Sequence, residues 1–202
     1  MDERGHGDFD HLGFEPAYEL EIDPEFPGSG SWDRPVHGFD LDGQRVDEFV
    51  ARWGAPRVLV VTPHHAAPWV GFWPHGGLGG LSGEFPMPNP TELCVAVGGA
   101  AFIVDVEKPE LGARVASVWA QQIVSCRDPA LLLLCTPVDI TAFDADGLAW
   151  ESPRLVMDDL HIIGIDGDRI NVTGNGFAHS TEHFEVDLHR GMRLVDAPDA
   201  DA

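Results

Sequence analysis

The chain has 202 residues, of which 44% are hydrophobic, a size and composition typical of a globular protein with its own core. Its 34 acidic residues outnumber its 12 basic residues, which gives a formal net charge of −22. A field of that sign repels phosphate backbones and anionic lipid surfaces, so we expect no nucleic-acid partner and no membrane partner.

Residues 1–40 are rich in glycine, proline and aspartate, which predicts an irregular N-terminal arm, disordered over its first dozen residues. Residues 41–195 predict a single mainly-β domain, and residues 196–202 an acidic tail. No secretory signal pattern and no apolar run of about 20 residues is found. We therefore expect a soluble, cytoplasmic protein.

The segment near residues 43–53 predicts one α-helix. Asp42 precedes it as an N-cap, and Gly54 follows its end. Four apolar side chains recur at the spacing of one helical face and are expected to pack on a sheet: Val46, Phe49, Val50 and Trp53.

Most of the remaining chain predicts β-strands. Residues 57–62 are rich in β-branched side chains, and from Glu92 onward short apolar runs alternate with turn residues. No segment between these runs has the length of a crossover helix, so we expect antiparallel pairing. The expected strands of the second half are 131–135, 139–143, 148–150, 162–165, 170–172 and 184–188.

Residues 113–125 fit two patterns. Part of the apolar spacing suits a helix, whereas residues 122–126, a turn at 127–129 and the run that follows suit a β-hairpin. We favour the hairpin for the second half of the segment. The complete fold class is then a mainly-β protein, a curved antiparallel sheet or half-propeller-like hairpins, with one packed helix.

Two segments suggest a duplication. Leu93 to Val106 and Leu132 to Ala145 each contain an apolar run, a break and a second run, at an offset of 39 residues. Residues 131–150, with a strand ending in Ala142-Phe143-Asp144 and a turn leading to Gly147 and Trp150, resemble the blade repeat of quinoprotein-like β-propellers. The chain otherwise resembles small bacterial proteins of unassigned function, which implies no activity.

The segment from Pro63 to Pro90 is expected to be a loop, dense in glycine, proline and aromatic residues. It carries a histidine group that could ligate a metal if the loop folded back: His64, His65 and His75. Its glycine run, residues 76–83, lacks the register of a phosphate-binding loop, so we interpret it as a flexible or tightly turning connection.

Aromatic side chains give this loop its main interest. They either close the core over the sheet or form a patch for a protein or ligand. We take as the candidate binding patch Trp69, Phe72, Trp73 and His75.

Other fragments resemble active-site motifs but lack the geometry. His179 to His183 reads H-x-x-E-H, which requires a helix, whereas an alternating strand separates such side chains by about 13 Å. Asp158, Asp159 and His161 precede or begin a strand, where capping is the simpler role. The three cysteines lack metal-ligand spacing and are interpreted as buried free thiols.

We therefore expect no catalytic residue, no cofactor and no bound metal. The leading hypothesis is a non-enzymatic binding or scaffold protein with a protein partner or a second copy of the chain. Two alternatives stay open: a hydrolase or metal-dependent enzyme that uses the histidine-bearing loop 63–83, and an acidic, immunity-like protein that neutralises a basic partner.

Overall fold

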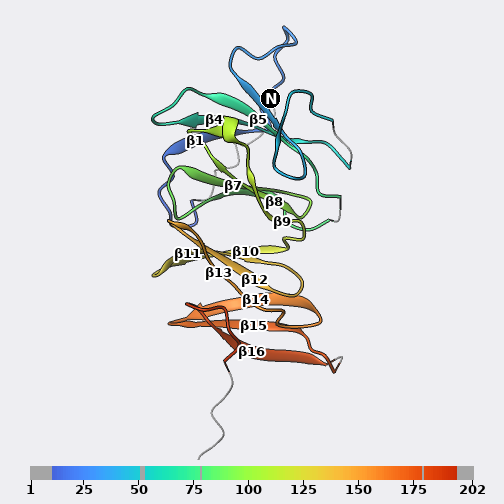
Figure 1. Ribbon diagram of the computed structural model, residues 1–202, viewed down its shortest axis with the longest axis vertical. Helices are drawn as coiled ribbons and strands as arrows, with labels where there is room; N and C mark the ends of the chain where they lie inside the picture. Colours follow the sequence, from blue (N-terminus) through green and yellow to red (C-terminus); the bar gives the residue numbers. More distant parts are fainter. Residues whose placement is uncertain (1–10, 51–52, 78, 179, 195–202) are drawn as a thin grey trace, which may run out of the picture. The chain divides into compact units, whose positions relative to one another are not determined.

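The computed structural model describes residues 11–50, 53–77, 79–178 and 180–194. The chain divides into two compact units, residues 1–120 and 121–202. The described residues form sixteen strands in four sheets (Figure 1). None of their helices is long and apolar enough to cross a membrane.

The first unit contains two sheets. One has the strand order β1-β4-β5-β2-β3, in which β2 and β5 run parallel and all other neighbours antiparallel. The other is an antiparallel meander, β6-β7-β8-β9. The strands of the first sheet are β1 (Tyr18–Ile22), β2 (Val36–Phe39), β3 (Arg45–Val46), β4 (Arg57–Pro63) and β5 (Trp69–Trp73); those of the second are β6 (Gly83–Pro86), β7 (Glu92–Val97), β8 (Ala100–Asp105) and β9 (Arg114–Ser117). A short 3₁₀ helix, Pro109–Leu111, joins the last two strands.

One core joins the two sheets of this unit. Leu59, Trp69 and Trp73 from the first sheet cluster with Val95 and Phe102 from the second, and all five are nearly inaccessible to solvent. The indole N–H of Trp69 donates to the carbonyl of Val106 at 2.9 Å, so its one polar atom is satisfied inside the core. The sheets are thus held by apolar burial with the polar atom of Trp69 paired.

The second unit also contains two sheets, both antiparallel meanders. The first has the order β10-β11-β12-β13 and the second β14-β15-β16. Their strands are β10 (Gln122–Arg127), β11 (Ala130–Cys135), β12 (Ile140–Asp144), β13 (Gly147–Glu151), β14 (Asp158–Asp166), β15 (Arg169–Asn175) and β16 (Thr181–Asp187). Alternate apolar side chains of both sheets, including Leu133, Ile140, Ile170 and Val186, form the core between them.

Side-chain amides fasten the two sheets of the second unit at one edge. Gln122 donates to the carbonyl of Ile162 and accepts from its N–H, both at 2.9 Å. These two bonds satisfy the backbone N–H and C=O of Ile162 on the edge strand β14, as a neighbouring strand would. At the opposite edge of the first of these sheets, the indole N–H of Trp150 on β13 donates to the carbonyl of Leu188 at 2.8 Å.

The predicted strands after Glu92 and their antiparallel pairing are confirmed. The expected strand at residues 57–62 is β4, and the hairpin favoured for residues 122–135 is formed by β10 and β11. Residues 113–125 contain β9 and the start of β10, with no helix between them.

The predicted helix near residues 43–53 is wrong for the described residues of that segment. Residues 40–44 form a turn and Arg45–Val46 is strand β3, while residues 51 and 52 lie outside the described part. The carboxylate of Asp40 accepts from the N–H groups of Asp42 and Gln44 at 2.9 and 2.8 Å. Gly43 adopts a φ of 74°, which ends any helical path there.

The periodic apolar side chains therefore do not share one buried face. Val50 and Trp53 are 67% and 63% exposed, whereas Val46 and Phe49 are partly covered. The apolar spacing fits a helix, but the hydrogen bonds of Asp40 and the positive φ of Gly43 stabilise a turn instead.

Two stretches expected to be irregular contain strands. Residues 1–40, expected as an irregular arm, contribute β1 and β2, and the expected loop 63–90 contributes β5 and β6. Strand β5 is rich in aromatic side chains, which suit a pleated sheet, although proline and glycine surround the strand. The boundaries predicted for the arm, the domain 41–195 and the tail stay predictions, and residues 195–202 lie outside the described part.

The two segments proposed as a duplication occupy equivalent strands. Leu93 to Val106 spans β7 and β8, and Leu132 to Ala145 spans β11 and β12, in each case the central pair of a four-stranded meander. The described strands form no closed propeller. The resemblance of residues 131–150 to a propeller blade stays a prediction.

We predict that Trp69→Ala lowers the free energy of unfolding of the first unit by about 3–5 kcal/mol, because it empties a large site in a closed core. Urea unfolding followed by circular dichroism measures the change. Trp119→Ala is the matched control, since Trp119 is 55% exposed in the same unit. An equal loss in both variants would contradict the assignment of Trp69 to the core.

The carboxyl group of Glu92 gives a pH-dependent prediction. Desolvation raises its pKa above the ordinary 4.5, against the opposing effect of Arg114, and its Oε2 is buried without a hydrogen bond to the described residues. The folded state therefore holds this proton more tightly than the unfolded chain does. The stability that follows is complete below pH 4.5 and is lost as the pH rises through the raised pKa.

We therefore predict that Glu92→Gln increases the free energy of unfolding at pH 7 by up to about 1 kcal/mol. The gain should shrink as the pH falls through the raised pKa of Glu92 and should vanish below pH 4.5. Urea titrations between pH 4 and 7 test this, with Glu19→Gln on the exposed side of β1 as the control. A loss of stability at pH 7 would show that the pairing with Arg114 dominates.

Candidate functional site

The turn after β2 places acidic and apolar side chains beside one another. Asp40 accepts the two backbone N–H groups described above, and Gly43 lies against Ala113, where a Cβ would approach the carbonyl oxygen of Ala113 to 2.1 Å. Only glycine fits this turn. Glu48 and Trp53, which follow this turn in the sequence, line the same pocket as Asp40.

His75 forms another wall of this pocket, and its ring is fixed by glycines. The N–H of Gly77 donates to Nδ1 of His75 at 3.0 Å, so in this geometry the ring proton resides on Nε2. A Cβ on Gly98 would lie 2.1 Å from Cε1 of the ring, and one on Gly54 would lie 3.2 Å from Cδ2. The imidazole therefore occupies space that only glycine backbone leaves open.

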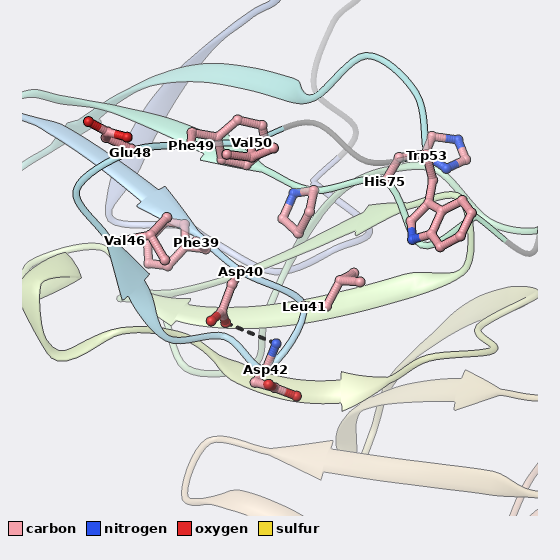
Figure 2. A pocket seen from close by; sticks show the side chains of 11 residues that line it. Phe39, Asp40, Leu41, Asp42, Val46, Glu48, Phe49, Val50, Trp53 and His75 are labelled. Carbon is pink, nitrogen blue, oxygen red and sulfur yellow. Dashed lines mark hydrogen bonds between the residues drawn. The ribbon is translucent and has the colours of Figure 1, made fainter.

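Trp53 lies next to His75 at the same end of the pocket (Figure 2). A Cβ on Gly77 would approach Cγ of Trp53 to 2.9 Å, so the tryptophan rests on the same glycine that binds His75. Its side chain is nevertheless 63% exposed. An exposed indole packed against the backbone of Gly77 is available for contact with another molecule.

The pocket has a volume of about 270 Å³ and three carboxylates in its lining: Asp40, Asp42 and Glu48. Figure 2 shows Asp40 and Asp42 in the lower part of the view and Glu48 at the end away from Trp53. No lysine or arginine is among the lining side chains that the structure describes. Apolar groups complete the wall: Phe39, Leu41, Val46, Phe49, Val50 and Pro74.

The four residues of the predicted patch are placed in three environments. Trp69 and Trp73 point into the core of the first unit and are 2% and 0% exposed. Phe72, one position along from Trp73, points to the opposite face of β5, where its ring meets that of Phe49 at 5.9 Å. His75 lines the pocket. Sequence reasoning missed Trp53 as a site residue, because the helical pattern assigned it to a core.

The histidine groups considered for metal binding are not brought together by the described structure. His64 and His65 are exposed, with ring centroids 6.5 Å apart. Among the described residues, no group of three or more His, Cys, Asp or Glu side chains could hold a metal ion.

The other two motifs lie in the second unit. His179 is outside the described residues; Glu182 and His183 belong to strand β16. Asp159 and His161 form an exposed pair at 3.1 Å on β14.

Comparisons with known proteins match no family model, no curated protein and no solved structure.

The variant Gly98→Ala tests whether Gly98 fixes the position of the His75 ring. The added methyl group requires the imidazole to move, and the φ of 56° at this position strains any non-glycine residue. We predict a loss of about 1–3 kcal/mol in unfolding free energy and a change in Trp53 fluorescence. Gly28→Ala, where nothing lies within 4 Å, should leave both unchanged. If Gly98→Ala changed neither the unfolding free energy nor the fluorescence, the glycines would not be fixing the ring of His75.

Proposed function

We propose that this chain is a non-enzymatic binding protein whose pocket at Trp53 receives a basic side chain of a partner protein. The observation that carries the proposal is the exposed Trp53 at the end of a pocket lined by carboxylates without a cationic side chain. A cation over an indole face is attracted by its π electrons, and tryptophan is the strongest aromatic partner.

The size of the pocket favours a side chain over a free small molecule. Sites that enclose whole ligands usually measure about 300–1,000 Å³, and this pocket, at about 270 Å³, is below that range. A guanidinium group is planar, stacks on aromatic faces and offers several donors to carboxylates. Arginine therefore suits the pocket better than lysine.

The charge of the chain supports the same partner. A net charge of −22 attracts basic proteins and accelerates their encounter. Asp42 and Glu48, both exposed, supply negative charge directly at the pocket.

The second candidate function, neutralisation of a basic protein, rests on this same complementarity. It differs in requiring that the bound partner lose its activity. The enzyme alternative that uses loop 63–83 stays a prediction, and Pro74 and His75 of that loop line the pocket.

The test uses a capped Gly-Arg-Gly peptide, with a citrulline peptide as the neutral analogue of the same shape. We expect the arginine peptide to bind and to shift the indole signal of Trp53 in NMR spectra of the whole chain. Trp53→Ala should weaken binding about tenfold, through loss of the stacked cation. The double variant Asp42→Asn with Glu48→Gln should lose more affinity for the arginine peptide at low salt than at high salt.

Matched variants separate the pocket from the general acidity of the chain. Trp119→Ala removes another exposed indole of the same unit, and Glu151→Gln with Asp166→Asn removes two exposed carboxylates elsewhere. Both should bind like the unaltered protein. Equal affinity for the citrulline peptide, or equal losses in the control variants, would exclude the pocket as the site.

A further inference from the structure

Among the described residues that line the pocket at Trp53, His75 alone can take up a positive charge. The other titratable groups of the lining are the carboxylates of Asp40, Asp42 and Glu48. Histidine is the side chain whose charge ordinarily changes between pH 5 and 8. The wall of the pocket therefore contains a group that can itself acquire the charge that the basic side chain of a partner brings.

The backbone around His75 favours the neutral form of its ring. The N–H of Gly77 donates to Nδ1 of His75 at 3.0 Å, and only an unprotonated ring nitrogen accepts such a bond. The ring has little room to turn away, because a Cβ on Gly98 would lie 2.1 Å from its Cε1. A proton on Nδ1 sets two donors against each other, so protonation must break the bond to Gly77.

Loss of this bond reaches Trp53 through Gly77. A Cβ on Gly77 would lie 2.9 Å from Cγ of Trp53, so the indole packs on the same backbone that donates to His75. Gly77 is exposed, and its N–H can turn toward water once the ring no longer accepts it. Movement of Gly77 shifts the surface on which the indole rests.

Charge acts in the same direction. A protonated His75 and the basic side chain of a partner would lie in one pocket of about 270 Å³, where two like charges repel each other. The carboxylates of Asp40, Asp42 and Glu48 attract either cation. Once one cation is present, the second gains less from them, so the proton and the partner compete.

We propose that the pocket exchanges a proton for the basic side chain of its partner. His75 is neutral while the partner is bound, and its protonation in mildly acidic solution releases the partner. Because the coupling between two ligands is reciprocal, binding of the partner returns the proton of His75 to the solvent. This inference rests on the proposed function and adds the regulation of the same site.

The experiment measures the affinity of the full chain for the capped Gly-Arg-Gly peptide at pH 7.5 and pH 5.5, at constant ionic strength. We expect the affinity to be about tenfold lower at pH 5.5, where histidine is ordinarily charged. Ordinary aspartate and glutamate side chains titrate near pH 4, so their protonation contributes little to this difference.

The matched variant is His75→Asn. The side-chain carbonyl of asparagine accepts the backbone N–H two residues further on, as Nδ1 of His75 does here, but it takes up no proton. Whatever its affinity at pH 7.5, the variant should bind less than about twofold more weakly at pH 5.5. The control His64→Asn removes an exposed histidine of the same unit and should keep the tenfold difference.

The chain without peptide gives a readout that needs no partner. In ¹⁵N spectra, the amide signal of Gly77 and the indole signal of Trp53 should move together, with one midpoint, between pH 7.5 and pH 5.5. In His75→Asn both signals should stay in place over this range.

Two results would overturn the exchange while leaving the arginine pocket intact: equal affinity at both pH values in the unaltered chain, or a tenfold difference that persists in His75→Asn. Should His75→Asn fail to fold, calorimetry of the unaltered chain at pH 6.5, in two buffers of different ionisation enthalpy, replaces it. Binding without release of protons would then overturn the exchange. Absence of binding at pH 7.5 would instead refute the proposed function and with it the exchange, whereas joint titration of Gly77 and Trp53 would still establish that His75 is coupled to the indole.

Discussion

Gly71 is the constraint on which the first unit depends. A Cβ at this position would lie 2.1 Å from Cη2 of Trp73 and 2.9 Å from Cζ3 of Trp69, so the two indoles fill the space that a side chain would occupy. The sequence Trp69-Val-Gly-Phe-Trp73 thereby sends two large rings to one face and leaves Val70 and Phe72 for the other. Each face then has a different use: the inner one closes the core, and the outer one supports covering loops.

That alternation explains why the predicted patch was divided. Trp69, Phe72 and Trp73 are close in sequence, and a loop could have displayed them together. In a strand, neighbours point to opposite faces, so Phe72 cannot join Trp73 on one surface. The existence of β5 was hidden by the proline and glycine residues around it, whereas the strands after Glu92 were predictable because their runs and turns repeat regularly.

The helix prediction failed for a related reason. Residues 46, 49, 50 and 53 fit a helical face, but periodicity reports only that apolar groups recur, not that the backbone is free to coil. Before the first of these apolar residues, Asp40 accepts two backbone N–H groups and Gly43 adopts a positive φ, which together form a turn. Asp42, interpreted from the sequence as an N-cap, instead donates its N–H to Asp40. The exposed Trp53 is the result, and with it the pocket.

The site itself could be predicted only in part. His75 was named from its loop, but its fixed orientation depends on Gly98, a residue of the turn between β7 and β8 that approaches it only in the folded chain. His75 and Gly98 are far apart in the sequence, and no local sequence pattern predicts that they meet. The same holds for the carboxylates, since Asp40 was expected in the irregular arm of residues 1–40 and Glu48 in the helix.

Charge and exposed rings together favour a partner of different sequence over a second copy of the chain. Exposed apolar rings such as Trp53 and Phe26 would promote self-association on a neutral protein. Trp53 lies in a pocket that also contains carboxylates, and two copies would bring like charges together there. Because physiological salt screens charge beyond about 8 Å, the carboxylates at the pocket rims matter more than the total charge. An identical acidic surface would be repelled by these local groups and a basic one attracted, which is why we propose a basic partner at the pocket of Trp53.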